Sequence, residues 1–152
     1  MVEFVKYFVR MSHTTAPANI SIEESYQVLI GFLMLAKRRV IELGAEHGLT
    51  GMQTMMLFML DKPKPMNSFT KAFNCDASNV TGLVDGLEQK DLAKRFESPH
   101  DRRIKMVELC DRGRHVRSAL LRGLAQQDNR LHSRLTPDEF QTFVSLLQKI
   151  TA

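Results

Sequence analysis

Three neutral polar residues, Ser78, Asn79 and Thr81, share one face of the helix that we expect over residues 76–91. Their side chains either form a solvated polar face or hydrogen bond to phosphate oxygens and base edges, which is the chemistry of nucleic-acid binding rather than of catalysis. The same helix holds one basic residue against four acidic ones. Its own charge would repel a polyanion, so the attraction to a nucleic acid must come from another part of the chain.

A basic segment directly follows that helix. Residues 94–117 hold eight basic and four acidic side chains, a net charge of +4 that equals the formal charge of the whole 152-residue chain. Neutralisation of phosphates by lysine and arginine is the main source of a protein's affinity for nucleic acids. This segment can therefore supply the attraction that helix 76–91 lacks.

The basic side chains surround a predicted turn. Apolar and polar residues alternate on both sides of the turn-rich run SPHDR, between residues 92 and 110, which indicates a β-hairpin. The side chains that we expect to contact DNA here are Arg95, His100, Arg102, Arg103 and Lys105. Arginine in a narrow minor groove recognises the shape of the groove, and other basic side chains bind phosphates.

Capping patterns mark the helices that precede the hairpin. Ser21 with Glu24 begins a long apolar helix that extends to about residue 44. Thr50 with Gln53 begins a shorter helix, and the prolines of KPKP end it because proline lacks an amide donor.

A helix-turn-helix is predicted immediately before the hairpin. A short helix over residues 67–73 ends at Asn74, a residue type that tolerates the left-handed conformation of helix exits. Asp76 can then cap the second helix. The apolar residues of that helix recur at i, i+3, i+4 and i+7, namely Val80, Leu83, Val84 and Leu87.

Two apolar helices are predicted after the hairpin. The first begins near Asp111 and carries on one side Val116, Leu120, Leu124, Leu131 and Leu135. The second begins at Thr136 and Pro137, and its apolar face holds Phe140, Phe143, Val144, Leu147 and Ile150. Terminal helices this apolar favour a homodimer, in which two copies of the chain bury them against each other.

These elements predict a mainly α fold with a small β-hairpin wing, that is, a winged helix-turn-helix with N- and C-terminal dimerisation helices. Residues 1–20 would form an N-terminal arm and linker, and residues 21–152 a single winged-helix domain. Within that domain the DNA-binding core spans about 48–110, and the dimerisation helices span about 21–44 and 111–150.

The run DASNVTGLVDGLEQKDL, followed by KR, DRR and VELCDRG, resembles the MarR family of bacterial transcription regulators. The family's usual run is close to D-P-S-T-V-T-R-L-V-D-R-L-E-K-K-G-L, followed by an arginine and a D-x-R wing tip. The resemblance covers about residues 21–150 in helix order, with its specific motifs in 66–114. It implies a dimeric winged helix that binds palindromic operators in double-stranded DNA and is often released by a small ligand or by thiol oxidation.

The resemblance also implies roles for the residues of the wing. Asp101 would pair with an arginine and brace the wing, while Arg103 enters the minor groove. Arg102 and Lys105 would bind phosphates nearby. Arg95 would be either the partner of Asp101 or another phosphate contact.

The chain departs from the family pattern at several positions. Gly82 and Gly86 stand where arginine is common, Asp91 where glycine usually ends the helix, and Cys110 where threonine is usual. Each interior glycine costs a helix about 1 kcal/mol relative to alanine. The acidic, glycine-bearing helix motivates an alternative function, a winged-helix protein-interaction module that has lost tight DNA binding.

Cysteine and methionine residues suggest two means of regulation, thiol oxidation and the binding of a small ligand. Cys75 precedes the second helix of the helix-turn-helix, where a helix N-terminus favours thiol reactivity, so it is a candidate redox sensor or else a small apolar plug. A group of methionines can line a pocket for a small aromatic ligand or fill the core: Met52, Met55, Met56 and Met59.

Other function classes lack support in the sequence. We find no catalytic constellation and no cofactor fingerprint, and the histidines show no zinc-type spacing, so we expect neither an enzyme nor a metal or cofactor site. No apolar run is long enough to span a bilayer, and the N-terminus does not resemble a signal peptide. With only two distant cysteines, the chain is expected to be cytoplasmic and free of membrane.

Overall fold

The computed structural model describes residues 21–126 and 134–151. The expected N-terminal arm of residues 1–20 lies outside the described residues, as does Leu131. The described chain is mostly helical with a small antiparallel sheet, which confirms the expected fold class. Its elements are α2 (Ile22–Glu46), α3 (Gly51–Met59), β1 (Lys64–Pro65), α4 (Met66–Phe73), α5 (Ala77–Glu88), β2 (Ala93–Glu97), β3 (Lys105–Leu109), α6 (Asp111–Ala125) and α8 (Pro137–Thr151).

Local capping explains where several helices begin. At the start of α2, the Ser21 hydroxyl accepts a hydrogen bond from the Glu24 amide at 3.1 Å, and the Glu24 carboxylate accepts one from the Ser21 amide at 3.0 Å. The same reciprocal arrangement starts α3 and α8, made by Thr50 with Gln53 and by Thr136 with Glu139. Each capping box satisfies two amides at a helix end, and the predicted helix starts are confirmed.

The wing is a sheet with the strand order β1-β3-β2. Strands β2 and β3 form the expected hairpin, in which Ala93 pairs with Leu109 and Glu97 pairs with Lys105. Strand β1 was absent from the sequence prediction, where its KPKP run only ended a helix. Lys64 of β1 pairs with Val107 of β3. Because β1 directly precedes α4, this pairing joins the helix-turn-helix to the wing.

One apolar core connects the helix-turn-helix, the sheet and α6. Its fully buried hydrophobic side chains are Met56, Leu57, Phe69, Val80, Val84, Leu87, Val107 and Leu120. The start of α6 approaches the preceding chain so closely that a Cβ atom at Gly113 would lie 1.8 Å from the Leu92 carbonyl oxygen. Only glycine fits at position 113, so α6 leaves the wing along a path set by this contact.

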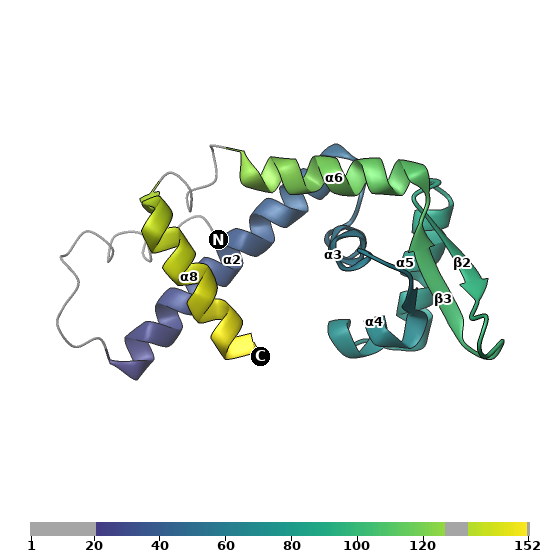
Figure 1. Ribbon diagram of the computed structural model, residues 1–152, viewed down its shortest axis with the longest axis horizontal. Coiled ribbons are helices and arrows are strands. Elements are labelled where there is room, and N and C mark those ends of the chain that lie inside the picture. The colour runs from purple at the N-terminus through teal and green to yellow at the C-terminus, as the bar shows by residue number, and fades with distance from the viewer. Residues whose placement is uncertain (1–20, 127–133, 152) are drawn as a thin grey trace.

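Helix α6 bridges the two ends of the molecule (Figure 1). At one end α2 and α8 cross, and at the other end lie α4, α5 and the sheet. The helix was expected to continue to about residue 135, but it ends at Ala125, and Gln126 is already extended with φ −65° and ψ 151°. The apolar periodicity therefore runs past the end of the helix.

The crossing helices α2 and α8 expose much of their apolar surface. The rings of Phe32 in α2 and Phe143 in α8 meet edge to face with centroids 5.6 Å apart. No residue of α8 is buried in the single chain. Within the described residues, no helix is both long and apolar enough to cross a membrane.

Candidate nucleic-acid interface

A tight turn sets the direction of α5. Asn74 adopts the left-handed conformation with φ 48° and ψ 52°, as expected for the exit of α4. Asp76 is the N-cap residue of α5, as expected, although its side chain makes no capping hydrogen bond. The expected helix-turn-helix is thus present, and its second helix spans Ala77–Glu88.

Helix α5 presents a polar face opposite its buried residues. Ser78 and Asn79 are exposed, and Thr81 is half-buried with its hydroxyl donating a hydrogen bond to the Ala77 carbonyl at 2.9 Å. Gly82 is exposed, and a Cβ atom there would meet no atom within 4 Å. This face can therefore approach a ligand closely without rearrangement of the core.

The wing tip is held by bonds to the backbone. The Asp101 carbonyl accepts a hydrogen bond from the Ile104 amide, and the Asp101 carboxylate accepts one from the Arg103 amide, each at 2.9 Å. His100, Arg102 and Arg103 are exposed. Neither the Arg102 nor the Arg103 side chain has an ion-pair or hydrogen-bond partner within the part of the chain that the structure describes. Two arginines are thus left available on an ordered turn.

Arg95 faces α5 rather than the wing tip, so pairing with Asp101, one of the two roles left open by the sequence, does not occur. Its Nε donates to the Glu88 carboxylate at 2.9 Å, and its Nη2 contacts Asp85. The Arg95 backbone amide also donates to Glu88 at 2.8 Å. Asp101 makes no ion pair among the described residues, and it binds an arginine only through the backbone amide of Arg103.

Most of the basic segment is engaged within the protein. The ion pairs of its cations join Lys94 to Glu108, Arg95 to Asp85 and Glu88, Lys105 to Glu97, and Arg114 to Asp111. The hydrogen bond from Arg114 holds the pKa of the Asp111 carboxyl below its usual value. Arg117 donates to the Phe58 carbonyl of α3.

Within the described residues, the cations of the segment left without a partner are Arg102, Arg103 and Arg112. The free positive charge is therefore concentrated at the wing tip.

The two cysteines each lie next to the start of a helix, Cys75 before α5 and Cys110 before α6. Cys75 is half-buried against the core in the turn before α5, and its amide donates to the Thr70 carbonyl at 3.2 Å. Cys110 is the N-cap residue of α6, and its amide donates to the Leu92 carbonyl at 3.0 Å. No group of acidic, histidine or cysteine side chains suited to a metal ion occurs among the described residues.

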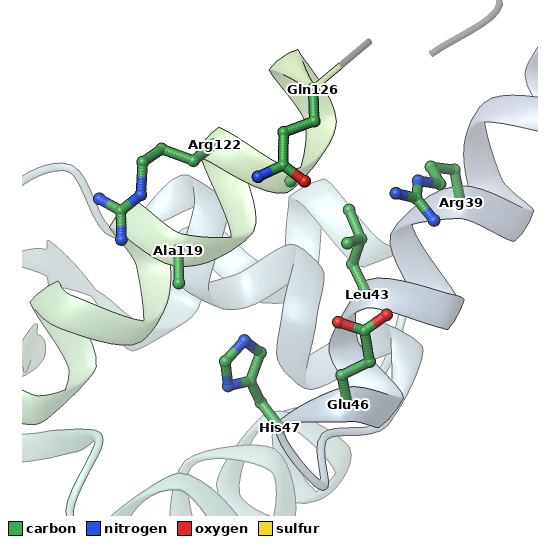
Figure 2. A pocket seen from close by; sticks show the side chains of 8 residues that line it. Arg39, Leu43, Glu46, His47, Ala119, Arg122 and Gln126 are labelled. Atoms are coloured by element: carbon green, nitrogen blue, oxygen red, sulfur yellow. The ribbon is translucent and has the colours of Figure 1, made fainter. Parts of the chain in front are cut away.

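The methionines of α3 divide between core and surface. Met56 is fully buried and Met59 packs against the core, whereas Met52 and Met55 are exposed. None of them lines the hollow that Figure 2 shows between the end of α2 and α6. This hollow has a volume of about 340 Å³, and its lining includes Arg39, Leu43, Glu46, His47 and Arg122. Core filling is confirmed for Met56, and the hollow is polar rather than rich in methionine.

Comparison with known proteins gives consistent matches. The model of the MarR family matches residues 49–105, from α3 to the start of β3. An uncharacterised HTH-type transcriptional regulator of Bacillus subtilis, YhbI, is 23% identical over 118 residues, covering 76% of this chain and 77% of that protein. A putative transcriptional regulatory protein for the hcr operon of Thauera aromatica is 25% identical over 122 residues, covering 80% and 72%.

Solved structures match over most of the chain. A mutant of E. coli MarR in complex with operator DNA is 24% identical, with a TM-score of 0.61 over 82% of this chain and 91% of that chain. The transcriptional regulator BldR from Sulfolobus solfataricus is 24% identical, with a TM-score of 0.66 over 87% and 98%. These similarities show that the chain has the winged-helix fold of these regulators.

Proposed function

We propose that the chain, whose residues 49–105 match the model of the MarR family, is a winged helix-turn-helix transcriptional regulator that binds a palindromic operator in double-stranded DNA as a homodimer. The wing tip carries the proposal, because Arg102 and Arg103 are exposed there without partners in the described chain. Exposed arginines on a narrow turn suit the minor groove, and a polar helix suits the major groove.

Each side chain of the interface has a proposed role. On α5, the groups for phosphates and base edges are Ser78, Asn79 and Thr81. Arg103 enters the minor groove, while His100 and Arg102 bind the flanking phosphates. Lys105 must exchange Glu97 for a phosphate; this ion pair is half exposed, and such pairs contribute only about 0–1 kcal/mol, so the exchange costs little.

An exposed apolar stripe on α2 supports the homodimer. Ile22, Tyr26, Leu29 and Leu33 recur at helical spacing on one side of the helix, and their exposed fractions are 79%, 62%, 43% and 54%. Monomeric proteins rarely leave a contiguous apolar surface of this kind in water. A second copy of the chain would cover the stripe and place two wings on one DNA site with two-fold symmetry.

Selection of bound duplexes from a random pool tests this function. We expect the selected sites to be palindromic, with half-sites about one helical turn apart. Sedimentation of the bound species should give two chains per duplex. Recovery of unrelated, non-palindromic sequences, or one chain per duplex, would contradict the proposal.

We further propose that a small aromatic acid regulates DNA binding from the hollow of Figure 2. Leu43 gives the hollow an apolar wall, and Arg39 and Arg122 supply cations from its two sides. Benzoate is a suitable probe, because a ligand that binds only the folded state raises the melting temperature. The increase should occur in the wild type and disappear in Arg122→Ala; equal increases in both proteins would exclude this site.

Oxidation is a second proposed route of regulation. Cys75 lies directly before α5, so oxygen added to its half-buried sulfur would disturb the start of the helix. Peroxide should then release DNA from the wild type and not from Cys75→Ser. An unchanged response in the variant would mean that Cys75 only fills apolar space beside the core.

We also propose that a DNA-binding regulator of this kind acts in the cytoplasm.

A further inference from the structure

The acidic charge of α5 is concentrated on the side that faces β2. Asp85 and Glu88 are one turn apart in the last part of the helix, and their side chains are 49% and 33% exposed. Unpaired, these carboxylates would repel a phosphate backbone that approaches α5, since charges at the protein surface interact over several ångströms.

Arg95 places one guanidinium between these two carboxylates. Its Nε lies 2.9 Å from Glu88, its Nη2 contacts Asp85, and its backbone amide adds a 2.8 Å hydrogen bond to Glu88. The side chain is 32% exposed, so the contact is partly shielded from solvent. One guanidinium beside two carboxylates leaves this group with a net negative charge, so the positive charge of Arg95 is already spent within the protein and offers no net attraction to a phosphate.

We infer that Arg95 is a positioning residue for DNA binding: it offsets part of the negative charge of Asp85 and Glu88 and ties the end of α5 to β2, without itself contacting DNA. This inference rests on the proposed function. It also accounts for how an acidic helix can approach DNA, and it weakens the charge argument for the protein-interaction alternative. The positive charge that meets phosphate then comes from Arg102 and Arg103.

A double-mutant cycle separates this role from a direct contact. Arg95→Gln is measured in the native background and in a background that carries Asp85→Asn and Glu88→Gln. If Arg95 acts through the two carboxylates, its loss should weaken DNA binding about tenfold in the native background, or about 1.4 kcal/mol. In the neutral background the same change should alter affinity less than about twofold, because no carboxylates remain to be neutralised.

Lys94→Gln is the matched control. Lys94 lies next to Arg95 on β2 and also pairs with a carboxylate, Glu108, but that carboxylate lies on β3 rather than on α5. We expect its effect on DNA affinity to be the same in both backgrounds. Melting temperatures of all variants show whether a loss of affinity is merely a loss of folded protein. If Arg95→Gln does not fold, Arg95→Met, which also removes the charge and keeps an aliphatic side chain, carries the same cycle.

The outcomes distinguish the inference from the function on which it rests. Equal loss of affinity in both backgrounds would make Arg95 a direct phosphate contact and overturn the inference. A fall in melting temperature with unchanged affinity of the folded protein would make its role purely structural and also overturn it. Absence of DNA binding by the wild type at low salt would instead contradict the proposed function itself.

Discussion

The carboxylate of Asp101 accepts a hydrogen bond from the backbone amide of Arg103 at 2.9 Å, so a single acidic side chain orders the backbone that carries the wing-tip arginine. Asp101→Ala removes this acceptor, and we expect DNA affinity to fall several-fold because the tip must be ordered on binding. Asp101→Asn keeps an oxygen acceptor in the same place and should retain most of the affinity. Fluorescence anisotropy with one duplex measures both. Equal losses in the two variants would assign the effect to the charge of Asp101 instead.

The two glycines of α5 should respond differently to alanine. A Cβ atom at Gly82 meets nothing within 4 Å, so Gly82→Ala should stabilise the fold by about 1 kcal/mol through helix propensity. A Cβ atom at Gly86 would lie 2.3 Å from Gln53 Nε2. Gln53 must then move, and the bond from the Thr50 amide to its side chain is lost. Loss of a helix cap costs about 1 kcal/mol, so Gly86→Ala should gain little or nothing.

Chemical unfolding of the two variants at one protein concentration tests this difference. The free energy of unfolding should be about 1 kcal/mol higher for Gly82→Ala than for Gly86→Ala. Equal stabilisation would mean that Gln53 moves aside without losing its capping role.

Asp91 occupies a backbone conformation that favours glycine. Its φ is 61°, and the Leu92 amide beyond it donates to the Leu87 carbonyl at 2.9 Å, as at many helix ends. Asp91→Gly should therefore stabilise the protein by about 0.5–1 kcal/mol, whereas Asp91→Ala should not. The expected rise in melting temperature is about 2–4 °C for each kcal/mol. A lower melting temperature for the glycine variant would contradict the assignment of strain to this residue.

Leu33 lies on the exposed apolar stripe of α2, where a charge would oppose contact with a second copy. Leu33→Glu should give a monomer by sedimentation and weaken operator binding at least about tenfold, because one chain reaches only one half-site. Gln27→Glu adds the same charge on another side of the helix, and it should remain a dimer. A dimeric Leu33→Glu variant would show that the stripe is not the interface.

Local patterns were sufficient to predict the helix starts and the helix-turn-helix. A capping box such as Ser21 with Glu24 joins residues three apart, so its geometry follows from the sequence alone. The left-handed Asn74 is equally local. Strand β1 was missed because its pairing of Lys64 with Val107 joins segments far apart in the chain. The end of α6 was placed too late because apolar periodicity continues beyond Ala125.

The types of residue in the candidate site could be predicted from the sequence, whereas the ion pairs among them could not. The sequence shows eight cations in the basic segment but not which of them bind carboxylates of their own chain. The contact of Arg95 with Asp85 and Glu88 depends on how β2 packs beside α5. A local signal existed, since two acids one turn apart are followed seven residues after Glu88 by an arginine.

The salt dependence of DNA binding shows whether the wing-tip arginines neutralise phosphates. Affinity for a selected duplex should fall steeply with salt, since log K decreases with log salt in proportion to the phosphates neutralised. The double variant Arg102→Ala with Arg103→Ala removes four wing-tip cations from a dimer, so its slope should be shallower by about 3–4. Arg38→Ala, which removes an exposed cation from α2, should leave the slope unchanged. A wing-tip variant with the slope and affinity of the wild type would contradict DNA binding through Arg102 and Arg103.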